Sequence, residues 1–329
     1  MGASAAIYGL SGLALTDAEL AFFREADPWG FILFARNIDN PDQVRNLTTS
    51  LRDAVGRDAP VLIDQEGGRV QRMRPPHWAE WPPMRDLCED PMDEMSRMER
   101  IRAQYTAIAV ELASVGIDVN CAPVLDVPQP DAHPIIGDRA FGWAPGEVAL
   151  RGREAMAALL EGGVLPVIKH LPGHGRALAD SHADLPRVGV DMDALRATDF
   201  LPFRALRDAP LGMTAHIVYE AIDPENCATL SPLAIKLIRE EIGFDGFLMT
   251  DDLSMHALTG PFAARATGAL DAGCDVILHC NGILTEMSEI ASVVPDLTGQ
   301  AAVRAERALA ARERPAVSAA QDLREVANG

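Results

Sequence analysis

Residues 164–175 read Val-Leu-Pro-Val-Ile-Lys-His-Leu-Pro-Gly-His-Gly, an apolar run that ends in charged and turn-forming residues. A short apolar run of this kind, bounded by Gly and Pro, is typical of a buried strand followed by a loop. A helical pattern over residues 147–161 precedes it. Similar runs recur along the whole chain, with helical patterns between them. This alternation predicts parallel strands that are joined by crossover helices.

The repeats are numerous enough to predict the architecture. The eight predicted strands cover residues 5–8, 30–34, 60–64, 118–123, 164–169, 211–215, 246–250 and 275–279. Helical patterns cover 41–54, 93–114, 147–161, 192–208, 232–242 and 260–272, with start signals at Asn40-Pro41 and Ser231-Pro232. Eight strand–helix units in 329 residues predict one (β/α)₈ TIM-type barrel domain over residues 1–329. Residues 299–328 predict two exposed terminal helices, broken at Pro315. An open, doubly wound sheet is the alternative.

The charge balance excludes several classes of partner. The chain has 29 Lys and Arg residues against 48 Asp and Glu residues, a net charge of −19. Nucleic-acid and anionic membrane surfaces attract clustered cations, so we expect neither partner. No run approaches the roughly 20 apolar residues of a membrane span, and the first residues do not resemble a secretory signal. Five cysteines without a CxxC pair indicate reduced thiols. We expect a cytoplasmic monomer.

Ionisable residues gather where the predicted strands end. In a barrel, catalytic groups lie at the carboxyl ends of the strands and in the loops that follow. These ends carry Asp64, Glu66 and Arg72 after the third strand, Asp126 and Arg139 after the fourth, Lys169 and His170 at the fifth, His216 at the sixth, and Asp251 and Asp252 at the seventh. Such charges are costly to desolvate unless they are paired or used. Buried ion pairs that close the barrel, with Asp64 or Asp126 as the partner of the cations Lys169, Arg72 and Arg139, are the alternative to a functional site.

Three of the eight histidines lie between His170 and His182. A metal site is one explanation, but the chain has neither an HxH first strand nor an HExxH helix, so we expect no metal. His174 lies between two glycines and suits a tight turn. In Asp180-Ser181-His182, the carboxylate can accept the imidazole N–H and raise its basicity, which suits a general acid/base. A solvated loop histidine is the alternative.

The adjacent carboxylates Asp251 and Asp252 end the seventh predicted strand. Neighbouring strand residues point to opposite faces, so only one of the two can face the barrel mouth. The preceding residues 247–249 are all apolar and do not decide which one it is.

Together these residues resemble a known family. The motifs KHLPGHG at 169–175, DSH at 180–182 and MTDDLSM at 249–255 closely resemble signatures of glycoside hydrolase family 3 β-N-acetylglucosaminidases. The likeness is to the single-domain bacterial enzymes of peptidoglycan recycling, and it covers nearly the whole chain, from residue 30 to residue 275.

The resemblance implies a role for each motif. It implies that Asp251 is the nucleophile, that His182 is the general acid/base, and that Asp180 is the partner of His182. It also implies that the sugar and its acetamido group contact Asp64, Arg72, Arg139, Lys169 and His170. The implied reaction is a double displacement with retention, without a cofactor.

The leading hypothesis is an exo-acting enzyme that removes terminal β-linked GlcNAc from 1,6-anhydro-MurNAc muropeptides. The alternatives are a family 3 β-glucosidase, a GlcNAc phosphorylase and a non-catalytic sugar-binding sensor on the same fold. The roles of His174, His216 and Asn281 stay open.

Overall fold

Eight parallel strands close into a barrel in a computed structural model that describes residues 2–177 and 185–312. The order of the strands around the barrel is β1-β12-β11-β9-β7-β6-β3-β2. Their bounds are β1 Ser4–Tyr8, β2 Pro28–Leu33, β3 Val61–Ile63, β6 Val119–Asn120, β7 Leu165–Leu171, β9 Leu211–Thr214, β11 Phe247–Asp252 and β12 Val276–His279. Each one overlaps a predicted strand, so the (β/α)₈ barrel is confirmed and the open sheet is wrong.

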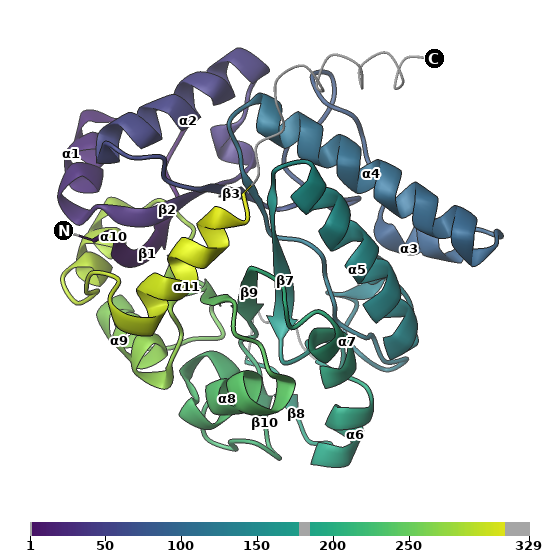
Figure 1. Ribbon diagram of the computed structural model, residues 1–329. Coiled ribbons are helices and arrows are strands. Elements are labelled where there is room, and N and C mark those ends of the chain that lie inside the picture. Colours follow the sequence, from purple (N-terminus) through teal and green to yellow (C-terminus); the bar gives the residue numbers. More distant parts are fainter. Residues whose placement is uncertain (1, 178–184, 313–329) are drawn as a thin grey trace.

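Helices surround the barrel and cover its outer face (Figure 1). They are α1 Asp17–Ala26, α2 Pro41–Val55, α3 Met84–Glu89, α4 Glu94–Ser114, α5 Pro145–Glu161, α6 Met192–Ala197, α7 Phe200–Ala205, α8 Pro232–Leu237, α9 Phe262–Ala272, α10 Leu284–Ala291 and α11 Gly299–Ala310. Two small sheets lie outside the barrel. One pairs β4 Gln65–Gly67 with β5 Val70–Gln71, and the other pairs β8 Arg187–Val188 with β10 Val218–Tyr219.

Local signals fix several helix ends. The Asn40 side chain accepts a hydrogen bond from the backbone of Gln43, and Pro41 supplies the first residue of α2. Ser231 caps α8 in the same way, so both predicted start signals are confirmed. The helix α1 was not predicted from its periodicity, although Thr16 and Glu19 form a capping box at its start.

Two predicted helices are interrupted. The pattern over 192–208 forms α6 and α7, separated at residues 198 and 199. Pro202 lacks the N–H that a continuous helix would direct to the carbonyl of Thr198, which explains the break. The pattern over 232–242 forms α8 followed by a single π-helical segment, Ile238–Ile242, which ends at Gly243 with a φ of 81°.

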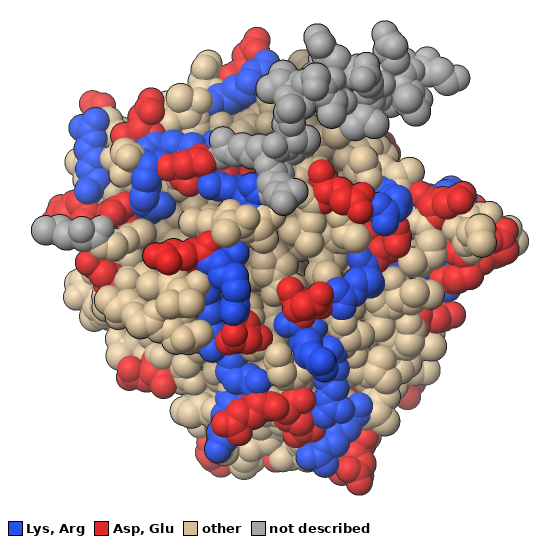
Figure 2. All heavy atoms as spheres, in the orientation of Figure 1, with Lys and Arg blue, Asp and Glu red and all other residues tan. Residues whose placement is uncertain are grey.

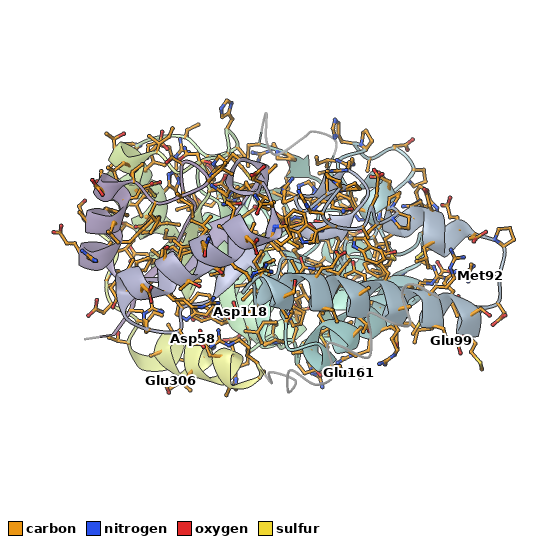
Figure 3. All side chains as sticks on the ribbon, turned by 90° about the horizontal axis from the view of Figure 1, so that it is seen from above. Asp58, Met92, Glu99, Asp118, Glu161 and Glu306 are labelled. Atoms are coloured by element: carbon orange, nitrogen blue, oxygen red, sulfur yellow. The ribbon has the colours of Figure 1, made fainter. Side chains whose placement is uncertain are left out.

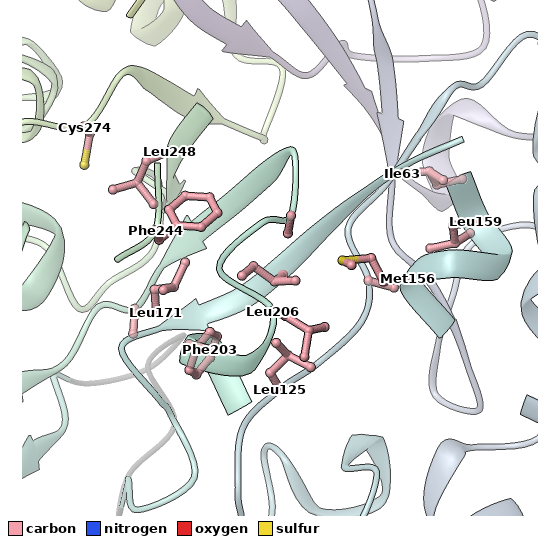
Figure 4. Close-up of a cluster of buried hydrophobic side chains, with 14 of the residues drawn as sticks. Ile63, Leu125, Met156, Leu159, Leu171, Phe203, Leu206, Phe244, Leu248 and Cys274 are labelled. Carbon is pink, nitrogen blue, oxygen red and sulfur yellow. The ribbon is translucent and has the colours of Figure 1, made fainter. Parts of the chain in front are cut away.

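Alternation along the strands divides the core into two layers. Side chains such as Ile7, Leu62 and Val167 form a cluster inside the barrel. Their neighbours in sequence point outward and pack under the helices, where Leu171 and Leu248 join buried residues of the surrounding helices and loops (Figure 4). Because both faces of each strand are buried, the strands read as continuous apolar runs.

The amino-terminal end of the barrel is covered by α11, which crosses it in Figure 1. Ala305 and Ala308 pack against the interior cluster. Arg312, just after α11, pairs with Asp118 and Asp58, which lie on the α11 side of the molecule in Figure 3. Acidic and basic side chains are interspersed over this face (Figure 2). The first of the two predicted terminal helices is therefore present, and the second lies outside the described residues.

All five cysteines are buried and free. Among the helices of the described residues, none combines the length and the apolar composition needed to cross a bilayer.

Candidate active site

A cavity of about 400 Å³ opens at the carboxyl ends of the barrel strands. Its charged and imidazole-bearing lining residues are Asp64, Arg69, Arg72, Arg139, Lys169, His170, His174, Asp251 and Asp252, and apolar residues such as Phe34, Met213 and Met255 complete the wall. A concave site that combines apolar walls with converging polar groups is typical of a small-molecule site.

Both carboxylates at the end of β11 line the cavity. Phe247 and Met249 belong to the cluster inside the barrel, whereas Leu248 packs in the outer layer. The pairing of β11 with β12 shifts register between Met249 and Asp252, so the alternation of side chains does not continue to the two aspartates. Their hydrogen bonds distinguish them instead.

The Asp252 carboxylate accepts hydrogen bonds from nearby backbone groups. Its Oδ1 accepts hydrogen bonds from the backbone N–H of Ser254 at 2.9 Å and of Cys280 at 3.0 Å. Its Oδ2 accepts from the Ser254 hydroxyl at 2.5 Å. Asp251 Oδ1 accepts from the Asp252 N–H at 2.8 Å. Asp252 therefore ties the end of β11 to the residue after β12, and Asp251 presents its carboxyl group on the cavity side.

Asp64 lies between two cations. Lys169 Nζ is 2.8 Å from Asp64 Oδ1, and Arg72 Nη2 is 3.1 Å from Asp64 Oδ2. Burial raises the pKa of Asp64, but the charges of Lys169 and Arg72 outweigh it and hold this pKa well below its usual range. The carboxyl group is therefore ionised and can accept hydrogen bonds.

Glu66 joins Lys169 to Arg139 behind the cavity. Glu66 Oε1 is 2.6 Å from Lys169 Nζ, and Arg139 forms two hydrogen bonds of 2.8 Å to the same carboxylate. Burial raises the pKa of Glu66, yet Arg139 and Lys169 lower it to about 2. Burial opposes the charge of Lys169, but Asp64 and Glu66 more than compensate and raise its pKa. All these groups are charged at neutral pH.

These pairs leave donors for a ligand. Lys169 has three N–H groups, and two of them face Asp64 and Glu66. Arg139 gives three of its five N–H groups to Glu66 and to the Ile135 carbonyl. Arg72 gives Nη2 to Asp64, and its side chain is 26% exposed. The cavity is thus built to accept oxygen atoms of a polar ligand.

The turn after β3 places Arg72 at the cavity. The buried Gln65 side chain accepts hydrogen bonds from the backbone N–H groups of Arg72 at 2.9 Å and Met73 at 3.1 Å. Gly67 has a φ of 105°, and a Cβ there would lie 2.5 Å from the Pro82 carbonyl oxygen. Only glycine suits this turn, because another residue would be both strained and in collision.

His170 and His174 meet at a second buried carboxylate, Asp126. His170 Nδ1 lies 2.7 Å from Asp126 Oδ2, and the backbone N–H of His174 donates a hydrogen bond to Asp126 Oδ1 at 2.6 Å. Burial lowers the pKa of His174 to about 4, so its imidazole is neutral at pH 7. The His174 backbone forms part of the turn, and its ring lines the cavity.

The cavity gathers most of the predicted site residues. Asp64, Arg72, Arg139, Lys169, His170 and Asp251 all line it, whereas Asp180 and His182 lie outside the described residues. His216 is buried behind the cavity, with Nε2 3.0 Å from the Asp252 carbonyl oxygen. The Asn281 side chain contacts Glu286 and the Ile283 N–H.

The structure also contains buried ion pairs of the kind that the alternative interpretation predicted. Lys169 and Arg72 pair with Asp64, as that alternative supposed, but Arg139 pairs with Glu66, which was not among the predicted site residues. The position of Glu66 in the polar stretch after the third strand was the available signal. Asp126 was predicted only as an ion-pair partner, and it contacts His170 instead. Among the described residues, no group of three or more His, Cys, Asp or Glu side chains forms a metal site.

Comparison with known families gives one match over most of the chain. The family described as "Glycosyl hydrolase family 3 N terminal domain" matches residues 25–310. The beta-hexosaminidase of Methylococcus capsulatus is 38% identical over 283 residues, which cover 84% of this chain and 82% of that protein. The beta-hexosaminidase of Pseudomonas aeruginosa is 36% identical over 275 residues, which cover 83% and 81% of the two chains.

Solved structures show the same similarity. NagZ from Neisseria gonorrhoeae in complex with N-trifluoroacetyl-D-glucosamine superposes with a TM-score of 0.89 at 29% identity, covering 98% of this chain and 94% of that one. The beta-N-acetylhexosaminidase from Beutenbergia cavernae gives a TM-score of 0.80 at 29% identity, covering 94% and 96%.

Proposed function

The chain belongs to glycoside hydrolase family 3, and from this we propose that it is a retaining, exo-acting β-N-acetylglucosaminidase. The observation that carries the proposal is that Asp251, near the end of β11, lines one cavity with Asp64, Arg139, Lys169 and His170. Relatives named beta-hexosaminidase are 36–38% identical to this chain over 275–283 aligned residues, and one structural neighbour binds an N-acylated glucosamine. A cavity of about 400 Å³ is large enough to hold one sugar ring, which suits the terminal residue of a carbohydrate chain.

In the first step, the Asp251 carboxylate attacks the anomeric carbon of a terminal β-linked GlcNAc. The glycosidic C–O bond breaks, and the departing oxygen takes a proton from the His182 imidazolium. A covalent glycosyl-enzyme on Asp251 results. Asp180 accepts the other N–H of His182 and fixes its orientation. The motif DSH at 180–182 supports these two roles.

In the second step, water attacks the same carbon while neutral His182 takes one of its protons. The bond between the sugar and Asp251 breaks, and the released GlcNAc keeps the β configuration because two inversions have occurred. Histidine suits both steps, because its usual pKa of about 6.5 lies near neutral pH.

The remaining cavity residues bind the sugar. Lys169, Arg139 and Arg72 donate charge-assisted hydrogen bonds to hydroxyl groups and to the acetamido carbonyl, and Asp64 accepts hydrogen bonds from hydroxyl groups. The ion pairs hold these side chains in place before the substrate arrives, so little side-chain entropy is lost on binding.

We further propose that the substrate is a GlcNAc-1,6-anhydro-MurNAc muropeptide from peptidoglycan recycling, and that the whole chain acts as one catalytic domain and as a monomer without a metal or cofactor. The family resemblance supports this substrate. Five free, buried cysteines are consistent with work in the reducing cytoplasm.

A trapping experiment tests the nucleophile. A fluorinated GlcNAc donor with a good leaving group slows the second step, so the labelled enzyme can be digested and its peptides identified by mass spectrometry. We expect the label on Asp251, and we expect Asp252→Asn protein to be labelled at the same residue. Labelling of any other residue, or none, contradicts the assignment.

Substrate comparisons separate the alternative activities. We expect hydrolysis of nitrophenyl β-GlcNAc and of an anhydro-muropeptide, and little hydrolysis of nitrophenyl β-glucoside, which a β-glucosidase would prefer. A strong rise in rate with phosphate, together with GlcNAc 1-phosphate as product, would identify a phosphorylase. Binding of GlcNAc in calorimetry without turnover would identify a sensor, and loss of activity with a chelator would identify a metal enzyme.

A further inference from the structure

Asp126 is a buried carboxylate that contacts two cavity residues but does not itself line the cavity. Its Oδ1 accepts hydrogen bonds from the backbone N–H groups of His170 at 3.2 Å and His174 at 2.6 Å. Its Oδ2 lies 2.7 Å from His170 Nδ1. Both oxygens therefore face the segment that carries His170, and the carboxylate connects the end of β7 to the turn at His174.

The contact with Oδ2 decides where His170 carries its proton. Burial raises the pKa of Asp126, but the His170 ring and the hydrogen bonds that the carboxylate accepts from it and from the His174 backbone lower this pKa below its usual value, so the group is ionised. An ionised carboxylate only accepts hydrogen bonds, so His170 Nδ1 must carry the hydrogen. In a neutral imidazole, Nε2 is then the acceptor.

His170 lines the cavity, and its Nδ1 edge is turned to Asp126. The opposite edge of the ring, which carries Nε2, is the edge left for a ligand. We propose that Asp126 is a positioning residue that keeps His170 in the Nδ1–H tautomer, so that Nε2 accepts a hydrogen bond from a sugar hydroxyl group. The identity of the donor as a sugar hydroxyl rests on the proposed function, whereas the tautomer does not.

This arrangement gives the site selectivity for a donor at that position. Lys169 and the arginines of the cavity can only donate hydrogen bonds. In its Nδ1–H tautomer, His170 adds an acceptor beside them, so a ligand hydroxyl is favoured there over a carbonyl or a carboxylate oxygen. The carboxylate of Asp126 thus acts on the ligand through His170.

The substitution Asp126→Asn tests the tautomer directly. The two backbone N–H groups keep their acceptor if the amide oxygen takes the place of Oδ1. The amide NH₂ then faces His170 Nδ1 and donates to it, which requires the opposite tautomer, with the hydrogen on Nε2. The variant has nearly the shape of the native residue, so it changes the direction of one hydrogen bond.

Nitrogen-15 NMR of the imidazoles at pH 8 reads the outcome without any substrate. The His170 signals are assigned by their loss in His170→Gln protein. We expect a protonated Nδ1 and an unprotonated Nε2 in the native protein, and the reverse in Asp126→Asn. An unprotonated Nδ1 in the native protein, a doubly protonated ring, or the same pattern in a folded Asp126→Asn protein would overturn the proposal. If the variant does not fold, the native spectrum alone decides.

Kinetics with monodeoxy analogues of nitrophenyl β-GlcNAc test the partner. In the native enzyme, removal of the hydroxyl that donates to His170 should lower kcat/KM about 10- to 100-fold, and in Asp126→Asn the same removal should cost at most a few-fold. Equal losses in both enzymes for every analogue would overturn the hydroxyl contact. An Asp131→Asn enzyme, altered at a more exposed carboxylate of the following loop, is the control and should behave as native. Absence of all GlcNAc hydrolysis would contradict the proposed function and leave the NMR result intact.

Discussion

Glu66 and Arg139 form a two-pronged ion pair behind the cavity, with Arg139 Nε and Nη2 each 2.8 Å from a carboxylate oxygen. Lys169 meets the same carboxylate at 2.6 Å. Glu66 is only 5% exposed, so water contributes little to stabilising its charge or those of its partners. Arg139 and Lys169, both proposed to bind the sugar, are therefore held in place by Glu66, which does not itself line the cavity.

Replacement of Glu66 by Gln should destabilise the protein and weaken catalysis together. The change leaves Arg139 and Lys169 without their shared anion, and breaking a buried pair in this way costs about 3–5 kcal/mol. Urea unfolding at pH 7 measures the loss. We also expect kcat/KM to fall, because both donors become free to move. Glu306→Gln, at an exposed position of α11, is the control and should change neither quantity (Figure 3). Native stability in the Glu66 variant would contradict the proposed role of the pair.

The sequence was sufficient to predict the barrel, because all eight strands are apolar runs at regular spacing and no long-range information is needed to see them. The family resemblance is likewise confirmed by the match over residues 25–310. The partner of Arg139 was harder to foresee. Glu66 lies 73 residues away from it in sequence, and only the closed barrel brings the two loops together.

The choice between Asp251 and Asp252 shows the same limit. A strand that is buried on both faces has no polar side, so residues 247–249 carry no alternation to read. In the folded barrel both carboxylates line the cavity, and only the hydrogen bonds of Asp252 to Ser254 and Cys280 set the two apart. Helix breaks were more accessible, because Pro202 was visible in the middle of the predicted helix 192–208.

The two adjacent carboxylates should respond differently to the same change. Asp251→Asn removes the proposed nucleophile, so we expect a roughly 10⁴-fold or larger loss of kcat, the order found when other enzymes lose theirs. Its melting temperature should stay near that of the native protein. Asp252→Asn weakens the hydrogen bonds to Ser254 and Cys280, so it should cost about 1–3 kcal/mol of stability and keep more activity. Rate assays and thermal melts of both variants check this contrast, and a larger activity loss for Asp252→Asn would reverse the assignment.

Asp199 should make a measurable contribution to the pH dependence of stability. Its side chain is fully buried, Oδ2 accepts a hydrogen bond from Arg176 at 2.6 Å, and Oδ1 has no partner among the described residues. Burial raises its pKa from 3.8 to about 6, against the effect of Arg176 and with a smaller contribution from nearby Asp126. Burial raises the pKa of Tyr219, and the charge of Asp199 raises it further.

The sign follows from proton binding. Between pH 3.8 and about 6, the native state holds the Asp199 proton more tightly than the unfolded chain, so stability falls as pH rises through this window. Asp199→Asn removes this effect. The variant should therefore gain about 2 kcal/mol relative to the native protein between pH 4 and pH 7. Urea unfolding of both proteins at the two pH values measures the difference. Asp193→Asn, at a carboxylate 94% exposed, is the control, and a difference that does not vary with pH would contradict the argument.

His182→Ala should distinguish proton donation from other roles of this residue. A sugar leaving group needs a proton as it departs, whereas nitrophenolate leaves with little help. We therefore expect a much greater loss of kcat/KM on a GlcNAc-anhydro-MurNAc substrate than on nitrophenyl β-GlcNAc. Asp180→Asn should show the same preference more weakly, because it acts through His182. Asp251→Asn is the matched control, since loss of the nucleophile should slow both substrates alike. Equal losses on the two substrates in His182→Ala would exclude this histidine as the general acid and direct the search to another group at the cavity.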